Sequence, residues 1–459
     1  MPLLYGKERF AMLQFSQATL DQLIDPRGHA CACGRTHKVS MDYLRIGPGA
    51  VRYLPDALRA VGGTKPFVVC DVNTEAAAWD SVRAVLDGAG VPYTLYRFPM
   101  EHVEPDEYAV GSLTMAFDPS CDCVMGIGSG VINDCCKVLC HAVGKKQLIV
   151  GTAPSMDGYA SNSSSMIRER IKVSLYNAAP AAILCDIDII KNAPMRMLWA
   201  GFGDMLAKYV ALCEWRISNL VTGEYYCENI AGLMRESLRK VVENAPGLKN
   251  RDEKAVQATV EGLVLSGIAM SYAGISRPAS GLEHYFSHLW EMMCLDRGKP
   301  YELHGIQVGV GTLLTLRLYD KIRNMTPDRK TAEAFMAGFS NDEWEAMIRR
   351  VFGKAAEAVI RQEHETFHKN DPARHARRLD NIIDGWSEIQ RFIAEELPET
   401  ETIAGLMRDL GMPMEPADIG ISRQDTEDAF IASRDIRDKY LTSSMLWDMG
   451  LLYRMKADI

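Results

Sequence analysis

The chain has 459 residues, of which 47% are hydrophobic and 24% are charged, values of a globular protein with room for two or three domains. Its net charge of -9 argues against a nucleic-acid-binding surface, because binding to phosphates needs a basic stripe and the sequence has none. No apolar run reaches the roughly 20 residues that span a bilayer, and residues 1–17 lack a signal-peptide core. We therefore expect a cytoplasmic protein without a membrane span.

Residues 1–195 alternate between short β-rich runs and helical stretches, a rhythm that predicts parallel βαβ units. Two strand–helix–strand steps are expected, with strands at 65–74, 92–98, 121–127 and 146–154 and helices at 75–90 and 132–144. From Pro194 onward long amphipathic helical patterns dominate, as in residues 197–220 and 252–274. We therefore place a domain boundary near residue 195.

The stretch "MGIGSGVIND", residues 125–134, has glycines at 126, 128 and 130 between a predicted strand and a predicted helix. Free backbone N–H groups and the positive end of a helix would hold a phosphate there, and a pyrophosphate would fit. The spacing is not G-x-G-x-x-G, so a tight turn with close packing of helix on strand is an equal alternative.

Two further segments favour a nucleotide. Asp71 ends an earlier strand, where a carboxylate can accept hydrogen bonds from an adenosine ribose, although it could also cap a turn within "DVNT". The loop 151–164, "GTAPSMDGYASNSS", offers hydroxyls and amides to a polar ligand, or is merely solvated.

Three histidines and an aspartate lie on otherwise apolar helical patterns. His284 and His288 are spaced i and i+4, His304 begins another predicted helix, and Asp204 has apolar neighbours. Such groups are costly to bury without partners, and imidazole with carboxylate is a ligand set for zinc and similar ions. Alternatively, Asp204 pairs with Lys208 and the histidines are satisfied core or surface residues.

Two other segments were weighed as metal sites. "HETFH", residues 364–368, matches H-E-x-x-H, but its charged setting before Pro372 favours a chance surface match. "CACGRTH" could bind zinc through Cys31, Cys33 and His37, yet no fourth ligand is evident, and a thiol-bearing loop is the preferred interpretation. The twelve cysteines are expected to be reduced thiols that fill core space.

Together these motifs resemble the sn-glycerol-1-phosphate dehydrogenases, a branch of the iron-containing alcohol dehydrogenase and dehydroquinate synthase superfamily. The segments occur in family order over roughly residues 65–315: "GIGSGVIND", "GTAPSMDGYAS", "GFGDMLAK", "SRPASGLEH" with "FSH", and "HGIQVGVGT". The "CACGRTH" start and the "IRDKYLTSSMLWDMGLL" end resemble the longer bacterial, arabinose-operon type.

The resemblance implies a Rossmann-like domain over 1–195, an all-helical, dehydroquinate synthase-like domain over 196–459, and a site in the cleft between them. It assigns the NAD(H) or NADP(H) contacts to Asp71, Gly128, Ser129, Gly130, Val131, Ile132, Thr152, Ser155 and Ser161. It assigns one divalent metal ion, Zn²⁺ before Ni²⁺ or Fe²⁺, to Asp204, His284 and His304, and the substrate contacts and proton relay to Asp157 and His288.

The expected reaction is reversible hydride transfer between the nicotinamide and C2 of glycerol 1-phosphate, which forms dihydroxyacetone phosphate. Arg277 is a candidate partner for the phosphate, or else a surface arginine between helices. The alternatives are a glycerol or polyol dehydrogenase with an unphosphorylated substrate and a dehydroquinate-synthase-like lyase. We also expect a homo-oligomer.

Overall fold

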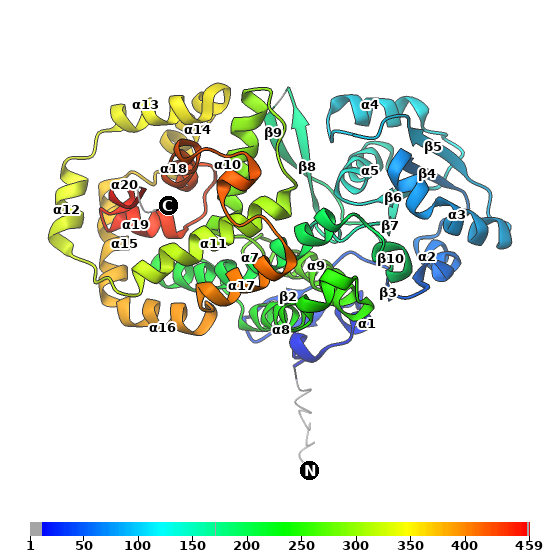
Figure 1. Cartoon of the computed structure of the whole chain (residues 1–459), viewed down its shortest axis with the longest axis horizontal. Coiled ribbons are helices and arrows are strands. Elements are labelled where there is room, and N and C mark those ends of the chain that lie inside the picture. The colour runs from blue at the N-terminus through cyan, green and yellow to red at the C-terminus, as the bar shows by residue number, and fades with distance from the viewer. Residues whose placement is uncertain (1–11, 170, 457–458) are drawn as a thin grey trace, which may run out of the picture.

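The computed structural model describes residues 12–169, 171–456 and 459. Figure 1 shows a sheet with its covering helices on one side of the molecule and a larger helical part on the other. The sheet has six parallel strands in the order β3 (Tyr43–Gly47), β10 (Ala182–Asp186), β7 (Lys146–Gly151), β6 (Cys123–Gly128), β4 (Pro66–Asp71) and β5 (Thr94–Phe98).

Alternating side chains of the strands pack on opposite faces of the sheet. Val68 and Cys70 pack with α2 (Leu54–Val61) and α3 (Val72–Gly88), whereas Phe67 and Val69 pack with α4 (Glu107–Ala116) and α5 (Gly130–Val143). Both faces of the strands are therefore covered by helices, which explains why the strands are nearly continuous apolar runs. The predicted βαβ organisation is confirmed.

The strand order reverses between β4 and β6. From β4 the chain passes through α3 to the edge strand β5, and it returns on the other side of β4 as β6, followed by α5. Because α3 and α5 cover opposite faces, they diverge from the carboxyl ends of these two neighbouring strands. In open α/β sheets, ligands bind in the crevice at such a reversal.

The chain after the sheet is helical, as predicted. The helices that carry the candidate site are α7 (Met195–Thr222), α9 (Glu253–Ala273), α10 (Leu282–Asp296) and α11 (His304–Ile322). Two short helices precede α7 in the chain, α1 (Leu20–Leu23) and α6 (Ile187–Ile190). The remaining helices of the helical part are α8 (Glu228–Asn244), α12 (Arg329–Ala337), α13 (Asn341–Phe352), α14 (Ala356–Gln362), α15 (Pro372–Asp384), α16 (Trp386–Glu396), α17 (Thr400–Leu410), α18 (Arg423–Ala432), α19 (Thr442–Asp448) and α20 (Leu452–Met455).

Helices α7 and α11 touch through glycines. A Cβ atom on Gly203 would lie 2.2 Å from the carbonyl oxygen of Gly305, and one on Gly305 would lie 2.0 Å from that of Ala200. Only residues without a side chain allow this approach of the two backbones. Asp204 and His304, each next to one of these glycines, are thereby held at one helix crossing.

Two features were not anticipated from the sequence. An antiparallel hairpin, β8 (Ser163–Arg168) and β9 (Ile171–Tyr176), lies between the sheet and α10 (Figure 1). The N-terminal segment, with the short hairpin β1 (His29–Ala30) and β2 (Thr36–His37), packs on α8 and α9 within a large apolar cluster that also contains residues of β3, β7 and β10. The domain boundary near residue 195 stays a prediction.

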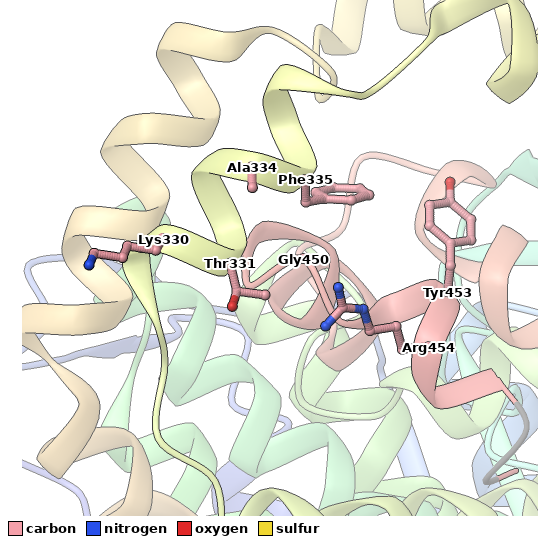
Figure 2. Close-up of a pocket in the computed structure, with 7 residues that line it drawn as sticks. All are labelled: Lys330, Thr331, Ala334, Phe335, Gly450, Tyr453 and Arg454. Atoms are coloured by element: carbon pink, nitrogen blue, oxygen red, sulfur yellow. The ribbon is translucent and has the colours of Figure 1, made fainter.

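A separate hollow lies between α12 and the C-terminal helices (Figure 2), lined by Lys330, Thr331, Ala334, Phe335, Gly450, Tyr453 and Arg454. The Phe335 ring packs edge-on against Trp447, with 5.4 Å between ring centroids. None of the lining residues belongs to the predicted site. Among the described helices, none combines the length and the apolar character needed to cross a bilayer.

Candidate active site

The glycine loop joins β6 to α5 at the reversal of strand order. Gly126 and Gly128 lie on the face of β6 that α5 covers, and a Cβ atom on Gly128 would lie 2.6 Å from the Cβ of Ile132. Close packing of helix on strand, the alternative weighed for this loop, is therefore present. The first N–H groups of α5 still have no acceptor within their own helix, and they lie at the carboxyl edge of the sheet.

The loop after β7 lies against the glycine loop. The N–H of Thr152 donates to the carbonyl of Gly128 over 3.1 Å, and the hydroxyls of Ser129 and Ser155 are 2.5 Å apart. Ser161 lies further along this loop, where its hydroxyl donates to the carbonyl of Ser163 over 3.0 Å. Except for Ser161, the predicted cofactor residues of these two loops form one contiguous surface.

Asp71 lies on the neighbouring strand β4, whose Val69 pairs with Gly126 of β6. Its Oδ1 accepts a hydrogen bond of 2.7 Å from the N–H of Thr74 and thereby caps α3. The capping alternative is thus observed, and it uses only one of the two carboxylate oxygens. Asp71 lies beside the crevice at the reversal of strand order. A hydrogen bond between its carboxylate and a ribose stays a prediction.

Asp204 is the centre of the second half of the site. Its side chain is completely buried on α7, and its Oδ1 lies 3.0 Å from Nζ of Lys208 and 3.4 Å from Nε2 of His284. Its Oδ2 accepts the N–H of Asp157 over 2.9 Å, which links it to the loop after β7. Burial would raise the pKa of Asp204, but the charge of Lys208 and the hydrogen bond from His284 hold that pKa far below its usual range.

Two histidines are each oriented by a buried carboxylate. Nδ1 of His284 lies 2.9 Å from Oε1 of Glu283, and Nδ1 of His304 lies 3.1 Å from Oε1 of Glu291 and 2.9 Å from the hydroxyl of Ser287. The two rings are 5.3 Å apart between centroids. When such a ring is neutral with its proton on Nδ1, Nε2 carries the lone pair, as in histidines that bind metal ions; a cation would replace the proton that Nε2 of His284 shares with Asp204.

His288 and His304 are neutral imidazoles. Burial and the positive charges of Arg437 and Lys172 lower the pKa of His288 well below its ordinary value, and burial and Lys172 lower the pKa of His304 to about 3. For His284, burial acts in the same direction, but Asp204 and Glu283 overcome it and raise its pKa. A neutral imidazole can accept a proton or bind a cation.

The site offers two overlapping donor sets for a metal ion. The predicted set, Asp204, His284 and His304, has 3.4 Å between Oδ1 of Asp204 and Nε2 of His284. That separation is close to the edge of about 3.3 Å between two ligands of one tetrahedral zinc ion. A second set, His288, Glu291 and His304, brings one donor atom of each residue within 4.8 Å of the others.

Asp157 is held in place by the helical part. Its Oδ2 lies 2.7 Å from Nζ of Lys208 and 2.8 Å from the hydroxyl of Ser266. Lys208 therefore joins Asp157 and Asp204 with one buried cation. The pairing of Asp204 with Lys208, considered as an alternative to a metal site, is present together with the histidine contact.

Several partners of the site were missed in the sequence. Glu291 follows His288 by three positions, so helical spacing could have placed it on the face of the site. Glu283 immediately precedes His284, and adjacent helical residues do not face each other, so spacing gave no signal for their contact. Lys172, which pairs with Glu291, comes from the unpredicted hairpin β8–β9 and carried no local signal.

Arg277 is not a surface residue. It is buried, and its guanidinium contacts Glu224, the hydroxyl of Ser218 and the carbonyl of Tyr440. These acceptors take four of its five N–H donors. The surface interpretation is therefore wrong, and the contacts give no support to the phosphate role.

The "HETFH" segment does not form a zinc site. It is a π-helical turn, Glu363–Phe367, in which Nε2 of His364 lies 3.0 Å from a carboxylate oxygen of Glu345. His368 ends the turn in a left-handed conformation, φ 50°, so the two histidines do not share a regular helix face.

Comparisons with known proteins agree with this geometry. The model of the iron-containing alcohol dehydrogenase family matches residues 45–194. Among solved structures, a probable glycerol dehydrogenase from Sinorhizobium meliloti has a TM-score of 0.57 at 17% identity and covers 91% of this chain and 98% of its own. The glycerol dehydrogenase of Schizosaccharomyces pombe has a TM-score of 0.58 at 16% identity, with 91% and 90% covered. These likenesses establish the fold.

Curated relatives extend over most of the chain. A glycerol-1-phosphate dehydrogenase from Halalkalibacterium halodurans is 30% identical over 413 residues, which are 89% of this chain and 93% of the relative. One from Hyperthermus butylicus is 35% identical over 286 residues, 62% of this chain and 80% of the relative. With a sheet, a reversal point and a histidine–aspartate cluster in the expected places, the chain belongs to the glycerol-1-phosphate dehydrogenase family.

Proposed function

We propose that this protein is an NAD(P)-dependent, metal-dependent dehydrogenase that interconverts dihydroxyacetone phosphate and sn-glycerol 1-phosphate. One observation carries the proposal: the carboxylate of Asp204, flanked by oriented histidines, is hydrogen-bonded to the same loop that lies on the glycine turn. The loop after β7 would therefore lie next to both the redox cofactor and the cation. Assembly into a homo-oligomer stays a prediction.

The reversal of strand order provides the place for the dinucleotide. The pyrophosphate would lie at the N-terminus of α5, on the N–H groups of Gly130, Val131 and Ile132, where the helix dipole favours negative charge. Asp71 would reach the adenosine ribose from the neighbouring strand with the oxygen that does not cap α3. Thr152 and Ser155 would then line the nicotinamide side, toward Asp204.

We assign the cation to Asp204, His284 and His304, the set that the family resemblance implies, although the described residues of this site with three donor atoms within 4.8 Å of one another are His288, Glu291 and His304. Nε2 of both histidines is available, since each Nδ1 is already held by a carboxylate. Glu291 already orients His304 and pairs with Lys172, which makes it an orienting group and not a ligand. When bound, NAD(H) supplies or accepts the hydride, and the cation polarises the oxygen on C2 of the substrate.

The remaining groups position the substrate and handle the proton. Lys208 and Ser266 hold one oxygen of Asp157, so its second oxygen can accept a hydrogen bond from a substrate hydroxyl. His288 is neutral and partly exposed, and it can take up the hydroxyl proton on a ring nitrogen and return it in the reverse direction.

The phosphate of the substrate would be held by Lys172 and Arg437. Arg437 donates to the hydroxyl of Ser174 over 3.0 Å, on the strand that carries Lys172, and both cations influence His288. Burial and the charge of Arg437 lower the pKa of Lys172 to about 7. A phosphate between them would give Lys172 a second negative partner beside Glu291 and would give one to Arg437, which favours a phosphorylated substrate over free glycerol.

The metal assignment is tested by replacing Asp204 with asparagine and Glu291 with glutamine. NADH oxidation with dihydroxyacetone phosphate should fall by about 10²- to 10³-fold in Asp204→Asn, the several kcal/mol expected of metal polarisation, and excess metal should not restore it. Glu291→Gln should need about 10- to 100-fold more metal for half-maximal activity but should recover at saturation. If excess metal restored Asp204→Asn but not Glu291→Gln, the ion would be assigned to His288, Glu291 and His304. Release of phosphate without net NADH oxidation would indicate a lyase.

The role of Asp71 is tested with Asp71→Asn, which keeps the helix cap because asparagine caps as well as aspartate. We expect the KM for NADH to rise about 10-fold, because asparagine lacks the charge that strengthens the hydrogen bond to the ribose. The KM for dihydroxyacetone phosphate should change little. Asp106→Asn is the control, since Asp106 caps α4 in the same way. Equal cofactor KM values in the wild type and in Asp71→Asn would remove Asp71 from the ribose site.

The phosphate assignment is tested by steady-state kinetics of Lys172→Ala. The KM for dihydroxyacetone phosphate should rise about 10-fold, because one charged hydrogen bond is lost. It should rise more than the KM for unphosphorylated dihydroxyacetone, since only the phosphorylated compound loses that contact. Lys146→Ala is the control, a strand lysine that is paired with Asp42 away from the site. If the wild type prefers dihydroxyacetone or glycerol over the phosphorylated compounds, the protein is a polyol dehydrogenase.

A further inference from the structure

A second group of metal-ligating side chains lies outside the active site. Cys31, Cys33 and His37 belong to the segment around the hairpin β1–β2, and Cys227 immediately precedes α8. One ligand atom of each of the four residues lies within 4.8 Å of all the others. Cys227 is therefore the fourth ligand that the sequence did not reveal, contributed from 190 positions beyond His37.

The distances in this cluster match a tetrahedral zinc ion. The sulfur atoms of Cys31 and Cys227 are 3.7 Å apart, and Nε2 of His37 lies 3.3 Å from Sγ of Cys33 and 3.6 Å from Sγ of Cys227. With Zn–S near 2.3 Å and Zn–N near 2.0 Å, a tetrahedron has edges of about 3.8 Å between sulfurs and about 3.5 Å between sulfur and nitrogen. A disulfide would require about 2.05 Å between sulfurs.

The surroundings orient the ligands. Nδ1 of His37 lies 2.9 Å from the carbonyl oxygen of Tyr272, which places the proton on Nδ1 and leaves Nε2 to face the thiols. The hydroxyl of Tyr225 lies 3.3 Å from Sγ of Cys33, and the side-chain amide of Asn229 lies 3.9 Å from Sγ of Cys31. Such donors to sulfur are typical of the second layer around a metal-bound thiolate.

The negative charge that this cluster would carry with Zn²⁺ bound is balanced by its surroundings. Three thiolates, one neutral imidazole and Zn²⁺ carry a net charge of about -1. Cys227 caps the N-terminus of the 17-residue helix α8, where the helix dipole favours a thiolate. The guanidinium of Arg35, between the ligands in the sequence, lies 3.4 Å above the ring of Tyr225 and keeps a cation next to the cluster.

We propose that Cys31, Cys33, His37 and Cys227 bind a structural Zn²⁺ ion. Four protein ligands leave no open position for a substrate, which distinguishes this site from the catalytic one. The ion would fix the N-terminal hairpin to α8 and α9, so that two chain segments far apart in the sequence are joined without a disulfide. His37 and Cys227 are almost completely buried, so the ion would be shielded from exchange.

Cobalt substitution tests the proposal in the full-length protein. Protein produced with Co²⁺ in place of Zn²⁺ should show tetrahedral ligand-field bands and a thiolate-to-cobalt charge-transfer band, which the sulfur-free active site cannot give. Cys33→Ser and Cys227→Ser should lose this band and, in zinc-grown protein, about one zinc per chain. Cys294→Ser and Cys121→Ser are matched controls, because Cys294 is partly exposed like Cys33 and Cys121 is buried like Cys227; both should keep the band and the ion.

A second measurement leaves all four residues of the cluster unchanged. X-ray absorption at the zinc edge of the His284→Ala protein, which retains the cluster, should show three sulfur scatterers near 2.3 Å and one nitrogen near 2.0 Å. A shell of only oxygen and nitrogen, a charge-transfer band that survives in Cys227→Ser, or a disulfide between Cys31 and Cys227 in the freshly purified protein would each overturn the proposal.

Discussion

A carboxylate without access to water must be compensated by positive charge, and this requirement organises the protein around Asp204. Its oxygens are shared among a lysine, a histidine and a backbone N–H from the sheet domain. Each partner comes from a different position along the fold, so the charge of one residue fixes how α7, α10 and the loop after β7 sit together. Removing any partner would leave a buried charge incompletely paired, at a cost of several kcal/mol. The same charge would attract a divalent cation to the place where Asp204 lies beside His284 and His304.

The glycine loop shows that packing and ligand binding do not compete for the same atoms. Gly126 and Gly128 lack side chains because α5 and its neighbours occupy the space. That close packing brings the N-terminus of α5 to the edge of the sheet, where its unpaired N–H groups face the point of strand reversal. The glycine pattern alone could not decide between a packing role and a phosphate site, because the structure uses the first to make the second possible.

Local patterns in the sequence were sufficient for most of the fold. Alternation of apolar runs with helical stretches predicted the parallel sheet, and long amphipathic periods predicted α7 and α9. The hairpin β8–β9 was missed, although residues 171–175 of β9 alternate apolar and polar types as a half-buried strand does. Local patterns could not show that the N-terminal segment packs on α8 and α9, because that contact joins residues about 200 positions apart. For the same reason the zinc interpretation of Cys31, Cys33 and His37 lacked its fourth ligand until Cys227 was seen beside them.

The candidate site was predictable where residue type and helical spacing carry the chemistry, as for His284, His288 and His304. The orienting groups were harder to identify, because a buried glutamate such as Glu291 acquires its role from the ring that it touches. Arg277 illustrates the opposite case: its position in a motif suggested a ligand, whereas the fold uses its guanidinium to join three buried segments.

The account depends on a cation held by Asp204, His284 and His304 beside the nicotinamide. Anomalous diffraction from crystals grown with a divalent metal ion and NAD(H) tests this most directly. We expect a peak bounded by the carboxylate of Asp204 and the Nε2 atoms of the two histidines, with the dinucleotide extending to the N-terminus of α5. A peak between His288 and Glu291, or none next to Asp204 while the dinucleotide is bound, would contradict the account.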